Sequence, residues 1–297
     1  MRKIFKVFMR SIWIFCMSII SFIMVYPLFY AAIAGLNKQE ELLSLGSILP
    51  IPEIPQWRNY GKVFSYSSSM LQPLLNTFFR TAWYTILVLI VTVLVGYILA
   101  RYEFRGKKFF MFIMIIAQVI PGVLTMIPTF VMVSNVPLVG GNNIFGNGGQ
   151  GLYNSMLMLY LPFGWGYLLW SFLFIRSMKS LPLGFEEAAM IDGAGLFKVL
   201  TYVIIPMQKP ILTVVAINVA LGTWNDWMTP FLYINDTART TLPSYVGKLT
   251  AMLQQFGTKD YPTVFALATI AIIPPLIVFL FLQKYIVQGI ASAGVKE

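Results

Sequence analysis

The chain has 297 residues, of which 58% are hydrophobic and 11% are charged, and its mean hydropathy is +0.76. Soluble domains carry about 25% charged residues, so this composition excludes an ordinary soluble enzyme and indicates a chain surrounded largely by lipid. The formal net charge of +10 does not indicate nucleic-acid binding, because the Lys and Arg residues gather at the ends of apolar segments.

Six segments are apolar and long enough to cross a hydrocarbon core about 30 Å thick, which needs roughly 20 residues. They are residues 11–36, 77–100, 109–134, 152–175, 203–229 and 262–287. The first begins like a secretory signal, but its apolar run continues well beyond the roughly 7–15 residues of a cleavable one, so we expect it to be retained. The predicted fold is an all-α membrane protein in which residues 1–297 form one transmembrane domain.

Positive charge predicts the orientation of these segments. If the N-terminus is cytoplasmic, the cytoplasmic segments hold roughly twice as many Lys and Arg residues as the external ones. That bias places both termini in the cytoplasm. The glycine-rich stretch 135–151 then becomes an irregular outer loop, and 176–202 becomes the longest cytoplasmic connection.

Polar residues inside two of the predicted spans recur at helical spacing. The members are Gln118, Gly122, Thr125 and Thr129 in the third span, and Asn218, Gly222, Asn225 and Thr229 in the fifth. Each set would share one helix face, either to allow tight helix packing or to line a polar path. Pro121 and Pro128 would free carbonyl groups in the third span, which a neighbouring helix or water must satisfy.

Catalytic signatures are missing from the sequence. It has no histidine, one cysteine (Cys16) and no glycine-rich phosphate-binding motif, so neither a metal site of spaced Cys and His ligands nor a P-loop ATPase site is encoded. Asp226 is the main ionisable residue at membrane depth. It is a candidate functional acid, or an inexpensive acid at the membrane surface, as its neighbours Trp224 and Trp227 suggest.

The polar stretch "GFEEAAMIDGAG", residues 184–195, interrupts the apolar pattern between two spans. A proline and a glycine precede it, two carboxylates suit the first turn of a helix, and two glycines would end that helix. The sequence predicts a short helix, a sharp bend and a second helix. Such a segment is either a solvated connector or, given the apolar Met190 and Ile191 beside two alanines, a surface that docks on another protein.

This segment resembles the EAA signature of permease subunits of binding-protein-dependent ABC importers. The match comprises Glu187, Ala188, Ala189, Gly193, Val203, Ile205 and Pro206 at the family's spacing, and the longer form with Asp192 and Pro210 is most similar to the carbohydrate branch, the maltose-type second permease. Six spans, "WNDWMTPFL" near the end of the fifth and the C-terminal "VQGIASAGVKE" extend the resemblance over most of the chain.

The resemblance implies a multi-pass subunit of the bacterial cytoplasmic membrane that imports a sugar or oligosaccharide. Its implied partners are a second permease in a heterodimer, an ATPase dimer that holds the ATP and Mg, an extracytoplasmic solute-binding protein and the lipid bilayer, but no nucleic acid. The chain itself would bind no cofactor. The segment 181–202 would couple it to the ATPase through Glu186, Glu187, Ala188, Ala189, Met190, Asp192 and Gly193. The tail would touch the ATPase through Gln288, Gly289, Ser292 and Gly294.

The expected substrate path combines amide, hydroxyl and aromatic groups, which suit a polar, uncharged ligand. Its predicted residues are Asn218, Trp224, Asn225, Asp226, Gln118 and Thr125. Three alternatives remain: an importer for a non-sugar solute such as an amino acid, peptide or phosphodiester, an intramembrane enzyme, and a stand-alone channel. An enzyme would need a reactive pair at membrane depth, and a channel would leave the docking segment unexplained.

Overall fold

The computed structural model describes the chain except residues 1, 45–47, 66–70, 161–167, 256–259 and 295–297. Every regular element in the described part is helical, as the composition predicts. The chain divides into two compact units, one formed by 1–71 and 246–274 and the other by 72–245 and 275–297. The chain passes between the units at the start of α4 (Leu71–Arg101), within α14 (Leu242–Gln255) and within α15 (Tyr261–Gly294).

The first unit is built around the C-terminal end of α1 (Arg2–Ala34), with the short helices α2 (Gln39–Ser44) and α3 (Arg58–Ser65). Asn59 fixes this end by donating to the carbonyl oxygens of Gly35 and Asn37 at 3.0 and 2.8 Å. Asp260, just before α15, pairs with Lys62 of α3 at 3.5 Å. Within this unit, residues 8–29 of α1 are largely apolar and almost all exposed, whereas residues 30–34 are half-buried or buried.

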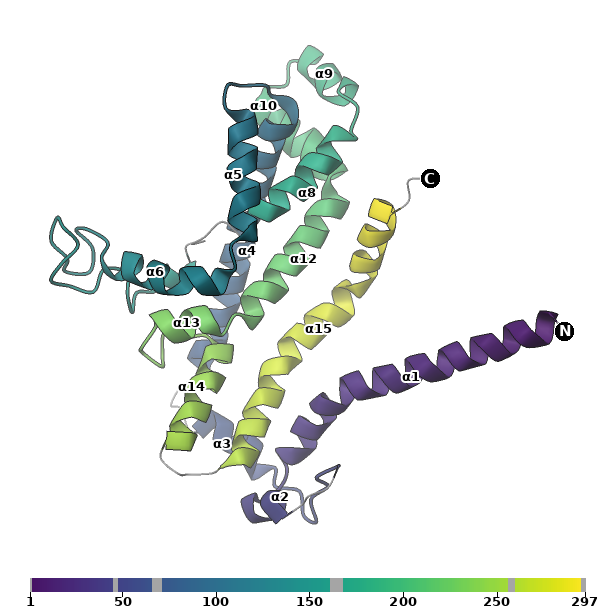
Figure 1. Ribbon diagram of the computed structural model, residues 1–297, viewed down its shortest axis with the longest axis vertical. Helices are drawn as coiled ribbons and strands as arrows, with labels where there is room; N and C mark the ends of the chain where they lie inside the picture. Colours follow the sequence, from purple (N-terminus) through teal and green to yellow (C-terminus); the bar gives the residue numbers. More distant parts are fainter. Residues whose placement is uncertain (1, 45–47, 66–70, 161–167, 256–259, 295–297) are drawn as a thin grey trace. The chain divides into compact units, whose positions relative to one another are not determined.

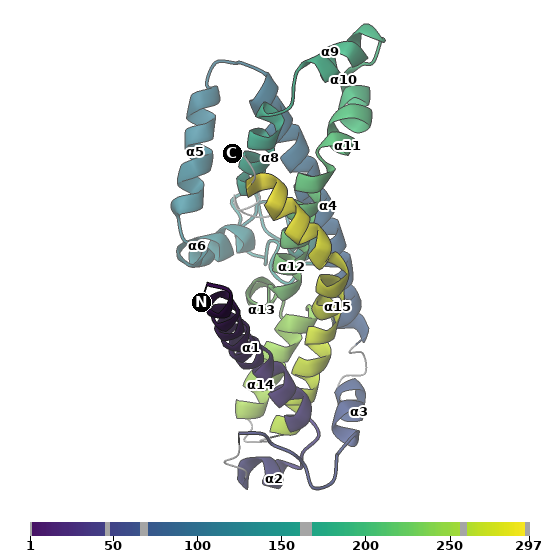
Figure 2. The ribbon, with the colours of Figure 1, turned by 90° about the vertical axis from the view of Figure 1, so that its right-hand side faces the viewer.

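The second unit is a helical bundle centred on α4 (Leu71–Arg101), α8 (Leu168–Lys179) and α12 (Lys209–Asn225), which run side by side in Figures 1 and 2. A Cβ at Gly96 of α4 would lie 2.6 Å from the Phe174 ring of α8, so the missing side chain allows this close packing. Around that contact lies a buried cluster of Val93, Tyr97, Phe174, Met178, Val199, Leu200 and Ile204.

The third predicted span is not one straight helix. It consists of α5 (Lys107–Val119) and α6 (Gly122–Ser134), which meet at an angle of 102°; Figure 1 shows α6 turning away from α5. Pro121 causes the break, because it lacks an N–H group and drives the preceding residue, here Ile120 with ψ of 115°, into an extended conformation. Gln118 of α5 therefore shares no helix face with Gly122, Thr125 and Thr129, which stay together on α6, and the predicted polar stripe of this span is wrong for Gln118.

The fifth predicted span is also interrupted. A π-helix at Val199–Ile204 leads into α11 (Ile205–Met207), and this segment meets α12 at an angle of 81° around Gln208. At its other end α12 stops at Asn225, and α13 (Met228–Tyr233) follows. Thr229 therefore leaves the predicted stripe, while Asn218, Gly222 and Asn225 remain together on α12.

Among the residues that the structure describes, three helices are long and apolar enough to cross a membrane: Phe8–Ala34, Leu71–Arg101 and Tyr261–Phe281. Each of the two bent pairs adds a further span if it crosses as a unit. The predicted fourth span, 152–175, includes residues 161–167, which lie outside the described part; α7 (Leu157–Tyr160) and α8 flank them. The all-helical membrane architecture is confirmed, and the count of six spans remains a prediction.

The glycine-rich stretch 135–151 is irregular, as predicted, and it is tightly hydrogen bonded. Asn142 donates to the carbonyl oxygens of Ser134 and Val136 at 2.9 and 3.0 Å, and it accepts from the amide of Gly149 at 2.8 Å. At Gly140, with φ of 59°, a Cβ would lie 2.0 Å from the carbonyl oxygen of Gly151. Glycine is required there by both the left-handed backbone and the close approach.

Candidate coupling surface and buried ion pairs

The segment between α8 and α12 folds as the sequence predicts. Helix α9 (Gly184–Ile191) is followed by a bend and by α10 (Leu196–Lys198), and both lie at one end of the bundle in Figures 1 and 2. The bend is a Schellman motif. Gly193 has φ of 80° and donates to the carbonyl oxygen of Met190 at 3.0 Å, and Ala194 donates to that of Ala189 at 2.9 Å. Gly193 thus ends α9 through the left-handed backbone that L side chains disfavour.

One side of α9 is exposed and largely apolar. The exposed side chains include Phe185, Met190 and Ile191, the last with 86% of its surface accessible, and Phe197 of α10 at 78%. The carboxylates of Glu187 and Asp192 are exposed beside them, as are Ala188 and Gly193. This combination of apolar bulk and peripheral charge suits a protein partner.

Two predicted members of the coupling set belong to the interior instead. Ala189 packs against the buried cluster around Phe174, because the Schellman motif folds this end of α9 onto the bundle. Glu186 retains 3% exposure, and its Oε1 pairs with Nη2 of Arg101 at 2.6 Å. From the sequence, Glu186 and Glu187 were both predicted to contact the ATPase. Successive residues of a helix point about 100° apart, so the two side chains face different surroundings. The packing of α9 on α4 determines that Glu186 is the buried one.

A second buried arginine lies near the other end of α4. Nη2 of Arg80 pairs with Oδ2 of Asp226 at 2.5 Å, and its Nε donates to the carbonyl oxygen of Leu159 at 3.1 Å. Oδ1 of Asp226 accepts from the amide of Thr229 at 3.1 Å and so caps the start of α13. Asp226, a predicted path residue, therefore holds together the α12–α13 break. Arg80 was not among the predicted site residues; its place in the early turns of an apolar helix was the available signal.

The remaining predicted path residues divide between surface and core. Asn218 and Asn225 are exposed on α12, as is Thr125 of α6, and Gln118 of α5 is half-buried. Trp224 is 5% exposed and makes an edge-to-face contact with Phe78, with ring centroids 5.0 Å apart. It belongs to the packing between α4 and α12 and not to an open path.

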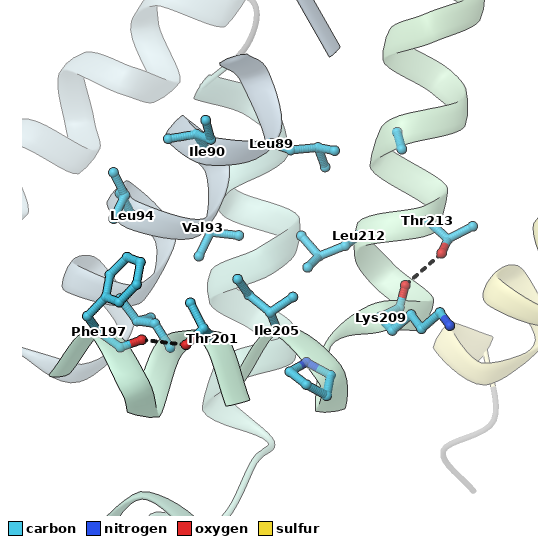
Figure 3. Close-up of a pocket in the computed structure, with 13 residues that line it drawn as sticks. Leu89, Ile90, Val93, Leu94, Phe197, Thr201, Ile205, Lys209, Leu212 and Thr213 are labelled. Carbon is cyan, nitrogen blue, oxygen red and sulfur yellow. Dashed lines mark hydrogen bonds between the residues drawn. The ribbon is translucent and has the colours of Figure 1, made fainter. Parts of the chain in front are cut away.

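An apolar groove lies between α4 and the bent segment that joins α10 to α12. Figure 3 shows Leu89, Val93 and Leu94 of α4 facing Phe197, Ile205 and Leu212 across it. Its volume is about 860 Å³. Lys209 is the charged side chain in its lining, so this surface suits a hydrocarbon chain or an apolar helix better than a sugar.

The predicted tail contacts, Gln288, Gly289, Ser292 and Gly294, follow the helical backbone of α15. Their side chains lie outside the described residues, so their contact with an ATPase stays a prediction.

Comparison with known proteins identifies the family. Residues 92–292, which include the coupling segment and both bent pairs, match the family model described as binding-protein-dependent transport system inner membrane component. The chain belongs to this family. It is therefore a multi-pass transport subunit of the cytoplasmic membrane, as the EAA signature predicted.

Individual relatives are similar to this chain over most of its length. The arabinooligosaccharides transport system permease protein AraQ of Bacillus subtilis is 27% identical over 98% of this chain and 97% of its own. The melibiose/raffinose/stachyose import permease protein MelC of the same organism is 30% identical over 77% of each chain. Among solved structures, a chain of a bacterial ABC transporter involved in the import of the acidic polysaccharide alginate matches 94% of this chain, with a TM-score of 0.74 and 23% identity. That likeness shows a shared fold.

Proposed function

We propose that this chain is one permease subunit of an ATP-driven importer for a sugar or oligosaccharide. The observation that carries the proposal is the exposed apolar surface of α9 and α10, which lies beside the EAA residues and is shaped by the bend at Gly193. A separate ATPase dimer would hold ATP and Mg, and its closure would displace α9. The sugar class rests on what relatives such as AraQ and MelC transport.

The other partners are those that the family implies. A second, homologous permease would complete a bundle of which this chain supplies half, with an extracytoplasmic binding protein delivering the sugar. The exposed apolar residues 8–29 of α1 suit contact with lipid or with that second permease. Both termini would be cytoplasmic, as the distribution of Lys and Arg predicts. The bundle would alternate between inward-facing and outward-facing states biased by nucleotide.

Within this chain, the exposed face of α12 is the best candidate for the sugar path. Asn218 and Asn225 lie on it, with Gly222 between them, and amide side chains are suitable hydrogen-bond partners for hydroxyl groups. Gln118 and Thr125 come from other helices and would contribute only where α5 or α6 lines the same path. Trp224 and Asp226 would support this face from behind through Phe78 and Arg80.

Purification with native partners is the first test. Affinity purification of the tagged chain from its own membranes should recover an ATPase and a second permease, identified by mass spectrometry. A Gly193→Pro variant should insert normally yet lose the ATPase, because proline cannot adopt the left-handed φ at this bend. Recovery of the chain alone would overturn the proposal. Ligand binding to the cognate binding protein, measured calorimetrically over a panel of sugars, amino acids and phosphodiesters, would decide between a sugar and the non-sugar alternative.

The proposed sugar path is tested by substituting Asn225 on the exposed face of α12. Uptake of the ligand so identified should fall in an Asn225→Ala variant, while the ATPase still co-purifies. The matched control is Thr213→Ala, on the groove face of the same helix, which should keep wild-type uptake. Unchanged uptake in the Asn225 variant would remove this face from the path.

A further inference from the structure

The two adjacent glutamates of α9 face different partners. Glu187 is exposed, whereas Glu186 turns inward to α4. Oε1 of Glu186 accepts a hydrogen bond from Nε of Arg101 at 2.6 Å and forms an ion pair with Nη2 of the same side chain at 2.6 Å, and Oε2 accepts from the hydroxyl group of Tyr97 at 2.9 Å. Both carboxylate oxygens are thus engaged by side chains one helical turn apart on α4.

The same arginine also holds the chain that enters α9. Nη2 of Arg101 donates to the carbonyl oxygen of Leu181 at 3.1 Å, so Arg101 contacts both the approach to α9 and its first turn. At the other end of α9, the Schellman motif ties the helix to the segment that becomes α10. The helix is therefore held at its start by α4 and at its end by its own backbone.

Farther along α4, the contacts with the coupling segment are apolar. On one side the buried cluster around Phe174 joins them, but on the other the apolar groove of Figure 3 opens between Leu94 and Phe197. Apolar contacts are not directional and allow helices to slide, whereas hydrogen bonds from a guanidinium and a phenol to one carboxylate fix distance and angle. Glu186 supplies the directional part of this junction.

We propose that Glu186, with Arg101 and Tyr97, is a positioning residue that makes α9 and α4 move as one body. This inference rests on the proposed function, because α9 is displaced only if an ATPase docks on it. Between Arg101 and Arg80 α4 runs 21 residues, roughly 32 Å at 1.5 Å per residue, which matches the thickness of the hydrocarbon core. A displacement of α9 is thereby delivered to the Arg80–Asp226 pair at the opposite end of α4.

The test measures whether α9 and α4 keep a fixed distance when nucleotide binds. In a Cys16→Ser background, cysteines replace Ile86 of α4 and Leu183 at the start of α9, both more than half exposed, and carry spin labels for pulsed dipolar spectroscopy. The sample is the complete transporter in lipid nanodiscs, either nucleotide-free or with ATP and vanadate. The wild-type sequence should give one distance peak that is the same in both states.

Glu186→Gln should match that peak without nucleotide and shift or broaden beyond its width with ATP and vanadate. A residue that merely stabilises the fold would not produce a nucleotide-dependent difference. Arg101→Met should behave like Glu186→Gln, and Arg101→Lys, which keeps a cation, should move toward wild type. Glu187→Gln is the matched control on the exposed side of α9 and should keep the wild-type distance in both states.

An unchanged distance in Glu186→Gln with ATP and vanadate would overturn the proposal, since the apolar cluster alone would then hold the junction. If that variant fails to assemble, Tyr97→Phe removes one donor and keeps the ring, and identical distributions in both states would overturn the proposal equally. Failure of the proposed function is seen separately and earlier, as the absence of any ATPase from the wild-type complex.

Discussion

An arginine of α4 pairs with a carboxylate both toward its start and at its end, and the two pairs differ in burial. At one end Arg101 and Glu186 are both buried, with 9% and 5% of their side chains exposed; at the other Arg80 is 6% exposed, but Asp226 is 26% exposed. Taking an ion out of water costs several kcal/mol, which good hydrogen bonds must offset. Removal of one partner should therefore cost more free energy at the Arg101–Glu186 pair than at the Arg80–Asp226 pair.

A third pair completes this series. Lys107, at the start of α5, is 10% exposed and pairs at 2.7 Å with Glu103, which is 89% exposed. This pair differs from the other two because water reaches the carboxylate of Glu103 freely. If burial determines how much stability is lost when one partner is removed, the loss should be largest for Arg101–Glu186, smaller for Arg80–Asp226 and smallest for Lys107–Glu103.

The largest effect is expected when Arg101 loses its charge. Arg101→Met leaves the carboxylate of Glu186 buried without its cation, and such a loss typically costs about 3 to 5 kcal/mol. The measurement is thermal unfolding of the purified transporter in nanodiscs. The control is Arg105→Met, an exposed residue of the following turn, which should leave the melting temperature within error. Equal effects of the two variants would contradict the assigned burial.

A smaller effect is expected at the other end of α4. Asp226→Asn removes the ionic part of the contact with Arg80, but its amide oxygen still caps α13, so the expected loss is about 1.5 to 3 kcal/mol. Asp236→Asn is the matched control, because the pair of Asp236 with Arg239 is exposed on both sides at 41% and 53% and should contribute less than about 1 kcal/mol. If Asp226→Asn lowered the stability as much as Arg101→Met, the expected difference between the Arg80–Asp226 and Arg101–Glu186 pairs would be contradicted.

The smallest effect is expected for Glu103→Gln. The hydrogen bond from Lys107 and its positive charge lower the pKa of Glu103, so the ionised form stabilises the fold. That contribution is complete above the ordinary pKa of a glutamate and is lost as the pH falls through the lowered value. The melting curves of variant and wild type should therefore differ little at pH 7 and converge at lower pH. A difference that grows on acidification would have the wrong sign.

Several features were predictable because they depend on local sequence alone. The helix of residues 184–191 and the bend at Gly193 follow from an acidic first turn and from the left-handed backbone that glycine permits. The apolar length of α4 follows equally from its composition. The break at Pro121 was signalled by the proline, but its angle of 102° depends on what the two halves pack against and lay beyond local reasoning.

Local sequence was sufficient for the class of this protein. Composition and the length of the apolar segments indicate a helical membrane protein, because a helix satisfies its backbone polar groups internally in lipid. The resemblance of residues 187–206 to the EAA signature, and not periodicity, indicates a subunit of a binding-protein-dependent transport system. Tertiary structure alone decided which of Glu186 and Glu187 is buried, and that Asp226 and Trp224 serve packing. The partners of these side chains, Arg101, Arg80 and Phe78, are distant in sequence, and side-chain contacts of that kind exist only once the helices are packed.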